Sequence, residues 1–234
     1  MTRWLDPHPV EIPASFANLN LPPFIVQTLL RRGINSPEEV EAFLHPDKIP
    51  SIPFPNIENA VERILLAIRN KEKICIWGDF DVDGQTSTAL LVQALQSLGA
   101  NIVYYIPVRG KESHGVHVES LKPIIDNGAK LIVTCDTGIT AHEAVDYANS
   151  RGVDVVITDH HDLGETLPNA KAIINPKLLP NNHLLANLAG VGVAYKLAEA
   201  LLDGRQRKVD GETQSIANGL QSENLLDLVA LGLI

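Results

Sequence analysis

Short apolar runs recur along the chain from residue 74 onward, and each is too short for a helix and rich in Ile and Val. Segments with apolar residues at helical spacing separate most of them. This alternation predicts an α/β fold with an open, mostly parallel sheet and helices on both faces. The expected buried strands are residues 74–77, 102–106, 131–135, 153–158 and 172–174. The expected helices are residues 57–69, 86–98, 118–127, 141–150, 188–202 and 224–231.

Residues 1–55 have a different pattern, rich in proline, with two short helical candidates. One is residues 22–32, closed by Gly33. The other is residues 36–44, where Ser36 is placed to cap the helix and Pro37 occupies its first turn. We interpret this segment as an N-terminal arm packed on the main domain, which takes up residues 56–234.

Polar clusters directly follow three of the expected strands. They are Asp79, Asp81 and Asp83 after the first strand, Asp136 with Thr137 and Gly138 after the third, and Asp159, His160 and His161 after the fourth. The carboxyl ends of parallel strands share one edge of a sheet, and ligands bind there in open α/β folds. We therefore expect the three clusters to converge.

Converged carboxylates and imidazoles would repel or desolvate one another at high cost unless cations are present. Oxygen ligands with some imidazole favour Mn²⁺ or Mg²⁺, and the excess of carboxylates suggests two ions with a shared carboxylate. A calcium loop also begins with the spacing of Asp79, Asp81 and Asp83, but its twelfth position requires Glu and is Leu90 here. Asp136 with Thr137 and Gly138 would, in isolation, equally suit a helix cap.

Composition narrows the class of protein further. The chain has 234 residues, 45% of them hydrophobic, which suits one medium domain or a core domain with an appendage. It shows no membrane-spanning run and no signal peptide, and Cys75 and Cys135 lie within expected strands as reduced core thiols. These features favour the cytoplasm. The net charge of -9 argues weakly against nucleic-acid binding, although a carboxylate cluster that holds metal ions makes any catalytic domain acidic.

The clusters resemble the motifs of the DHH phosphoesterase family, whose name describes Asp159-His160-His161. The match includes residues 78–84 and 136–138. Residues 105–109, 174–177 and 188–197 narrow the resemblance to the single-strand-specific exonuclease (RecJ-type) branch, over roughly residues 50–234. This resemblance implies a nuclease that removes nucleotides from the 5′ end of single-stranded DNA, with Mn²⁺ or Mg²⁺, in repair and recombination.

The resemblance also implies roles for individual residues. Asp81, Asp83, Asp136 and His160 match metal ligands, with Asp136 as the bridging carboxylate, and Asp79 matches either a ligand or a residue that supports one. Asp136, His160 and His161 would form the catalytic group. Arg109 and His161 match phosphate contacts, a task that suits a guanidinium group, and Gly190 and Gly192 would let the backbone approach a phosphate. An exposed loop charge and helix-start glycines are the simpler interpretations of Arg109 and of the two glycines.

Two departures from the family pattern affect these expectations. After Arg109 the family continues to an aromatic Gly-Tyr-Gly motif, whereas residues 112–117 read Glu-Ser-His-Gly-Val-His here. Residues 227–234 match the approach to a fourth motif, whose metal-binding aspartate would follow. We therefore expect a chain that is incomplete at its C-terminal end, that binds Mn²⁺ and that has little exonuclease activity alone.

Two other functions remain open from the sequence. A small-substrate enzyme of the same family, acting on short oligonucleotides or cyclic dinucleotides, would share the metal site. A non-catalytic DNA-binding scaffold with the same fold would be marked by lost ligands, but Asp81, Asp83, Asp136 and His160 are all present.

Overall fold

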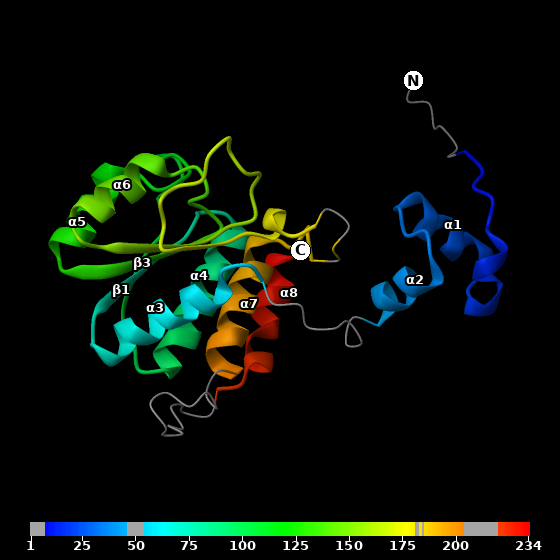
Figure 1. Ribbon diagram of the computed structural model, residues 1–234, viewed down its shortest axis with the longest axis horizontal. Helices are drawn as coiled ribbons and strands as arrows, with labels where there is room; N and C mark the ends of the chain where they lie inside the picture. The colour runs from blue at the N-terminus through cyan, green and yellow to red at the C-terminus, as the bar shows by residue number, and fades with distance from the viewer. Residues whose placement is uncertain (1–7, 46–53, 181–182, 184, 204–219) are drawn as a thin grey trace. The chain divides into compact units, whose positions relative to one another are not determined.

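The computed structural model describes residues 8–45, 54–180, 183, 185–203 and 220–234 (Figure 1). The chain divides into two compact units, Met1–Ile52 and Pro53–Ile234. Each unit is described by itself.

The smaller unit consists of short helices around a small apolar core. Its elements are the 3-10 helix η1 (Ala14–Leu19) and the helices α1 (Pro23–Arg31) and α2 (Pro37–Leu44). Ser36 caps α2 by accepting a hydrogen bond from the Glu39 amide, and the Glu39 side chain completes the capping box, so this predicted cap is confirmed. The core of the unit is formed by Phe16, Val26, Leu29 and Val40.

The larger unit is built on a five-stranded sheet in the order β2-β1-β3-β4-β5, and every pairing is parallel. The strands are β1 (Lys73–Trp77), β2 (Asn101–Tyr105), β3 (Ala129–Cys135), β4 (Asp154–Thr158) and β5 (Ala172–Ile174). The predicted open parallel sheet is confirmed. The chain places β2 on one side of β1 and then crosses to the other side to form β3, β4 and β5. In open sheets, ligands bind beside the point where the order of the strands changes direction in this way, here between β1 and β3.

Helices cover both faces of the sheet (Figure 1). One face carries α3 (Ile57–Arg69), α4 (Val82–Ser97), α7 (Gly190–Asp203) and α8 (Leu226–Gly232), and the other carries α5 (Val118–Asp126) and α6 (His142–Ser150). Short 3-10 helices, η3 (Pro176–Leu178) and η5 (Ser222–Leu225), complete the described elements.

Alternation along the strands explains the two-faced core. In β1, Ile74 and Ile76 pack into the apolar cluster under α3, α4 and α7, whereas Cys75 and Trp77 pack into the cluster under α5 and α6. Both cysteines are free and buried, and burial raises the pKa of each thiol to about 12.

Three sequence expectations about individual elements were wrong. The strand at 102–106 is not buried, because β2 lies at the edge of the sheet, and the side chain of Tyr104 is 66% exposed. Helix α4 begins at Val82, four residues earlier than expected, so Asp81 becomes its N-cap and Asp83 lies in its first turn. The expected helix at 224–231 is divided into η5 and α8.

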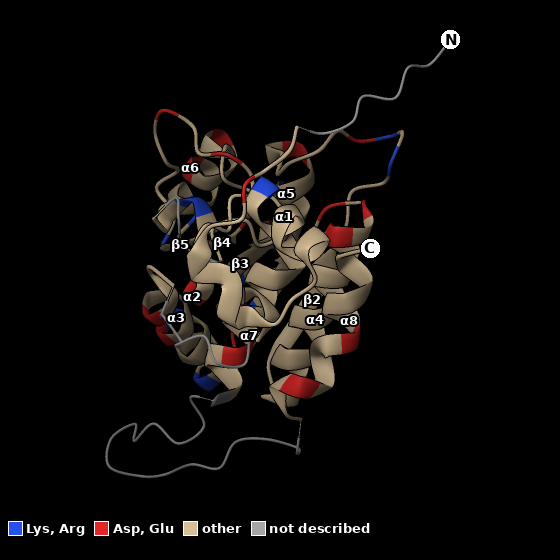
Figure 2. Ribbon diagram, turned by 90° about the vertical axis from the view of Figure 1, so that its right-hand side faces the viewer, with Lys and Arg blue, Asp and Glu red and all other residues tan. Residues whose placement is uncertain are grey.

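Acidic residues lie on several helices of the larger unit. Figure 2 shows Asp and Glu on helices of both faces of the sheet, α3 and α6 among them. No helix in the described part of the chain is long and apolar enough to cross a membrane.

Candidate metal centre

The polar clusters that follow β1, β3 and β4 converge at the carboxyl ends of these three strands. Oxygen atoms of Asp79, Asp81 and Asp136 lie within 4.8 Å of one another, and so do ligand atoms of Asp136, His160 and His161. Asp136 belongs to both groups because β3 lies between β1 and β4 in the sheet. Each group could hold a divalent cation, and Asp136 is the residue that the two groups have in common.

Asp136 lies directly after β3 in a conformation that few residues other than glycine adopt. Its φ is 60°, and its amide donates to the carbonyl oxygen of Thr158 at the end of β4 (3.0 Å). The side chain is 1% exposed, and burial raises its pKa to about 6. The protein therefore uses a strained backbone to place a carboxylate where desolvation is costly, a combination typical of functional sites.

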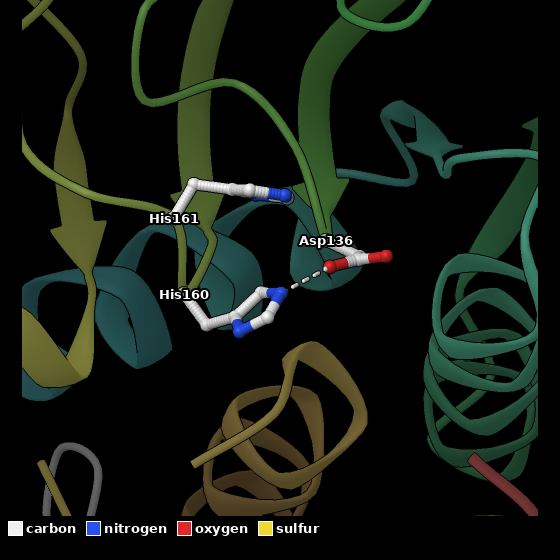
Figure 3. Close-up of side chains that lie close together, drawn as sticks. All are labelled: Asp136, His160 and His161. Atoms are coloured by element: carbon white, nitrogen blue, oxygen red, sulfur yellow. Dashed lines mark ion pairs between the residues drawn. The ribbon is translucent and has the colours of Figure 1, made fainter. Parts of the chain in front are cut away.

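One oxygen of Asp136 accepts no well-aligned hydrogen bond from the described residues. His160 Nε2 lies 3.0 Å from Asp136 Oδ1, and the two side chains point toward one another (Figure 3). Nevertheless, no hydrogen bond with acceptable geometry reaches this buried oxygen from the described residues. A buried carboxylate oxygen without a well-aligned hydrogen bond costs free energy, and a cation would satisfy it. The residues present therefore fit a divalent metal ion.

Asp79 and Asp81 are positioned by the turn that connects β1 to α4. Asp81 caps α4 by accepting a hydrogen bond from the Gly84 amide (2.8 Å). A Cβ atom at Gly84 would lie 2.6 Å from the carbonyl oxygen of Asp79, so only glycine lets the first turn of α4 approach this closely. The turn thus directs both carboxylates to the edge of the sheet.

Asp83 faces the beginning of α7. Its two oxygens accept hydrogen bonds from the amides of Gly190 (2.7 Å) and Val191 (2.6 Å). His160 Nε2 lies 3.7 Å from Asp83 Oδ2. Asp83 therefore joins α4 to α7 beside the cluster, and its remaining lone pairs are available to a cation.

The histidines after β4 are held by Asp159. This carboxylate is 1% exposed and accepts hydrogen bonds from the amides of Ile139 and His160, and it also contacts His161 Nδ1 at 2.7 Å. The hydrogen bond to Asp159 raises the pKa of His161 to about 9, and the pKa of Asp159 is lowered although burial alone would raise it. The neighbouring carboxylate of Asp136 raises the pKa of His160. His161 is consequently a cation at neutral pH in the metal-free protein.

Arg109 lies on the loop between β2 and α5, beside the first acidic cluster. Its guanidinium carbon is 4.3 Å from the centre of the Phe80 ring. The carboxylate of Glu112 organises this loop by accepting hydrogen bonds from the Val108 amide (2.9 Å) and from the hydroxyl of Tyr105. These hydrogen bonds, led by that of Tyr105, lower the pKa of Glu112.

The structure brings most of the predicted site residues together. Gly190 lies close to the acidic cluster, since a Cβ atom at this position would be only 2.5 Å from Asp136 Oδ1. Its amide donates its hydrogen bond to Asp83. Gly192 lies one residue beyond Val191 in α7, where an added Cβ atom would meet the side chain of Leu188. Its expected phosphate contact stays a prediction.

Two supporting residues were missed by the sequence analysis. Asp159 was recognised as part of a motif, but its role in fixing both histidines was not. His114 Nδ1 contacts Asp79 Oδ2 at 2.8 Å, and the only sequence signal was that His114 lies where the chain departs from the aromatic family motif.

A parallel α/β sheet with carboxylates and imidazoles gathered at its strand ends is typical of a metal-dependent enzyme. Residues 73–233 match the model of the DHH family, N-terminal domain. The chain belongs to the DHH family.

Its relatives include single-stranded-DNA-specific exonucleases named RecJ. The chain is 42% identical over 215 residues to the protein from Escherichia coli, and the match covers 92% of this chain and 37% of the relative. It is 39% identical over 219 residues to the protein from Bacillus subtilis, and that match covers 92% of this chain and 26% of the relative. The chain therefore spans about a quarter to two fifths of the length of these relatives.

Solved structures support the same assignment of the fold. RecJ from Thermus thermophilus in complex with Mn²⁺ matches with a TM-score of 0.70 at 29% identity, over 94% of this chain and 29% of that one. Another exonuclease RecJ bound to manganese matches with a TM-score of 0.62 at 31% identity, over 78% of this chain and 48% of that one.

Proposed function

We propose that this chain is the metal-binding catalytic domain of a cytoplasmic single-strand-specific DNA exonuclease that works from the 5′ end and acts in DNA repair and recombination. The observation that carries the proposal is the position of Asp136, which belongs to both groups of ligand atoms and has a buried oxygen without a hydrogen bond from the described residues. The relatives supply the substrate, since they are named for their action on single-stranded DNA.

The residues that would hold two divalent ions, Mn²⁺ or Mg²⁺, are Asp79, Asp81, Asp136 and His160, with Asp83 beside them. Such ions, when bound, supply a water of lowered pKa and offset negative charge on a phosphoryl group. The relatives from Thermus thermophilus have been solved with Mn²⁺ and with Mg²⁺, which supports both ions as candidates.

The chain's own cations would bind and orient the scissile phosphate. Asp159 occupies His161 Nδ1, which leaves Nε2 to donate a hydrogen bond to a phosphoryl oxygen. Arg109 can present paired N–H groups to a phosphate from its position over Phe80. Donors placed in this way stabilise the charge that increases on the phosphoryl oxygens as the bond to the leaving oxygen breaks.

The proposal is tested in two stages with the 234-residue protein. Calorimetric titration with Mn²⁺ should show binding that Asp136→Ala abolishes or strongly weakens. The protein is then mixed with Mn²⁺ and a 5′-labelled single strand, the matching duplex or a dinucleotide. Preferential binding or degradation of the single strand supports the exonuclease. Preferential turnover of the dinucleotide would instead identify a small-substrate enzyme, and metal-independent DNA binding without turnover would identify a scaffold.

A further inference from the structure

His114, on the loop between β2 and α5, contacts the metal centre although it lies outside the polar clusters that follow β1, β3 and β4. His114 Nδ1 lies 2.8 Å from Asp79 Oδ2, and the Asp79 side chain is 5% exposed although that of His114 is 68% exposed. A carboxylate only accepts hydrogen bonds, so Nδ1 is the protonated nitrogen in this contact. An exposed imidazole thus reaches inward to a buried carboxylate.

The two oxygens of Asp79 are divided between this contact and the backbone. Oδ1 accepts from the Phe80 amide at 2.6 Å, and Oδ2 pairs with His114. The two contacts together fix the plane of the carboxylate, which a single hydrogen bond would leave free to rotate. That plane decides whether an Asp79 oxygen faces Asp81 and Asp136, the other members of its ligand group.

The ring of His114 is itself held in place. It packs on Phe80 with ring centres 4.2 Å apart, and Phe80 follows Asp79 directly in the sequence. The loop that carries His114 is anchored to the sheet, because Trp77 Nε1 donates to the carbonyl oxygen of Gly115 (3.3 Å). Glu112 adds a hydrogen bond from Ser120 Oγ (2.8 Å) at the start of α5. The imidazole is therefore positioned before any ligand arrives.

We propose that His114 is a positioning residue of the metal centre, which orients the Asp79 carboxylate toward the cation through its Nδ1–H. Hydrogen-bond partners of this kind typically change metal affinity by about 10- to 100-fold when they are removed. The inference rests on the proposed metal site. It adds a residue that acts through Asp79 and touches neither the cation nor the phosphate.

The test measures the Mn²⁺ dissociation constant by calorimetric titration, together with the melting temperature in EDTA. His114→Ala should raise the dissociation constant roughly tenfold. His114→Asn should restore most of the affinity, because the Asn Nδ2–H₂ group occupies nearly the place of Nδ1–H. His114→Gln should not, because its amide lies one bond farther out. A loss equal for all three variants would overturn the inference.

A double-mutant cycle separates positioning from general loosening of the loop. In an Asp79→Ala background, His114→Ala should cost no further Mn²⁺ affinity, since the carboxylate on which it acts is absent. Ser113→Ala is the matched control, because Ser113 is the exposed neighbour of His114 on the same loop and its hydroxyl contacts His117 (2.9 Å) and not Asp79. Equal losses for Ser113→Ala and His114→Ala, or an undiminished loss in the Asp79→Ala background, would refute the role of His114.

The same titration separates this inference from the proposed function. If the unaltered protein takes up no Mn²⁺, the metal site itself is refuted. If it binds Mn²⁺ and Asp136→Ala does not, while His114→Ala binds with unchanged affinity, only the positioning role fails.

Discussion

The carboxylate of Asp83 is bound by the amide of Gly190, with 2.7 Å between Asp83 Oδ2 and the Gly190 nitrogen, although the two residues are 107 positions apart. The Val191 amide binds the other oxygen at 2.6 Å. Hydrogen bonds to a charged acceptor at the beginning of a helix are strong, because the free amides and the helix dipole both favour the negative charge. This contact joins α4 to α7 at the metal centre.

Gly190→Ala should damage the metal centre. The new Cβ atom would lie 2.5 Å from Asp136 Oδ1 and 2.8 Å from its carboxyl carbon, and Asp136 is packed too tightly to move freely. We expect a large loss of Mn²⁺ affinity and a lower melting temperature in EDTA.

Gly192→Ala is the control for that experiment. Its Cβ atom would meet chiefly the end of the Leu188 side chain, at 2.9 Å, and that side chain can adjust. Mn²⁺ affinity should therefore change little. Equal losses for the two alanine variants would show that the close approach of Gly190 to Asp136 is not what the site requires.

Mn²⁺ binding should weaken as the pH falls through about 6. Burial raises the pKa of Asp136 to about 6, and a cation must displace the proton from this carboxyl group. In the metal-free protein the effect on stability has the opposite sign. Because the pKa in the folded state is raised, the contribution of Asp136 is complete below its unfolded pKa and is lost as the pH rises through about 6.

Titrations with Mn²⁺ at a series of pH values, paired with melting curves in EDTA, measure both effects. Asp136→Asn cannot titrate at this position and serves as the control. It should flatten the pH dependence of the metal-free melting temperature near pH 6. A parent protein whose melting temperature in EDTA rises steadily across that range would contradict the assignment.

The sequence predicted the parallel sheet and the convergence of its acidic clusters because both depend on local patterns. Alternating strand and helix signals require parallel pairing, and parallel pairing places Asp79, Asp136 and His160 at one edge. The Mn²⁺ or Mg²⁺ expectation followed from the same residue types and is matched by the metal-bound relatives.

The supporting contacts could not be predicted in this way. The bond between Asp83 and Gly190, and that between Asp79 and His114, each join segments whose relative placement depends on tertiary packing. The burial of β2 was overestimated for a related reason, since an apolar run does not reveal whether its strand lies at an edge. Helix α4 was expected to begin later because Asp81 was considered only as a ligand and not as a cap.

Asp159→Asn should lower the pKa of His161. The hydrogen bond to Asp159 is the largest cause of the present pKa of about 9, so without the charged partner His161 should titrate near its ordinary range. NMR titration of the histidine rings in metal-free protein measures this directly. The pair stabilises the parent fully below the unfolded pKa of His161, and this contribution is lost as the pH rises through about 9. A His161 resonance that titrates identically in both proteins would show that Asp159 does not hold its proton.

Arg109→Ala should weaken the binding of single-stranded DNA while Mn²⁺ affinity stays the same. Arg109 contacts the ring of Phe80 and none of the ligand groups, so its removal takes away a phosphate donor and leaves the carboxylates in place. A charge-assisted hydrogen bond contributes roughly 1.5–3 kcal/mol, which corresponds to a weakening of about ten- to a hundredfold. Arg109→Lys keeps the charge but loses the paired donors, so it should recover only part of the affinity. Fluorescence anisotropy with a labelled single strand, in Ca²⁺ or Mn²⁺ and at fixed salt, gives the affinities. If Arg109→Ala binds the strand as tightly as the parent, Arg109 is a loop charge without a role in substrate binding.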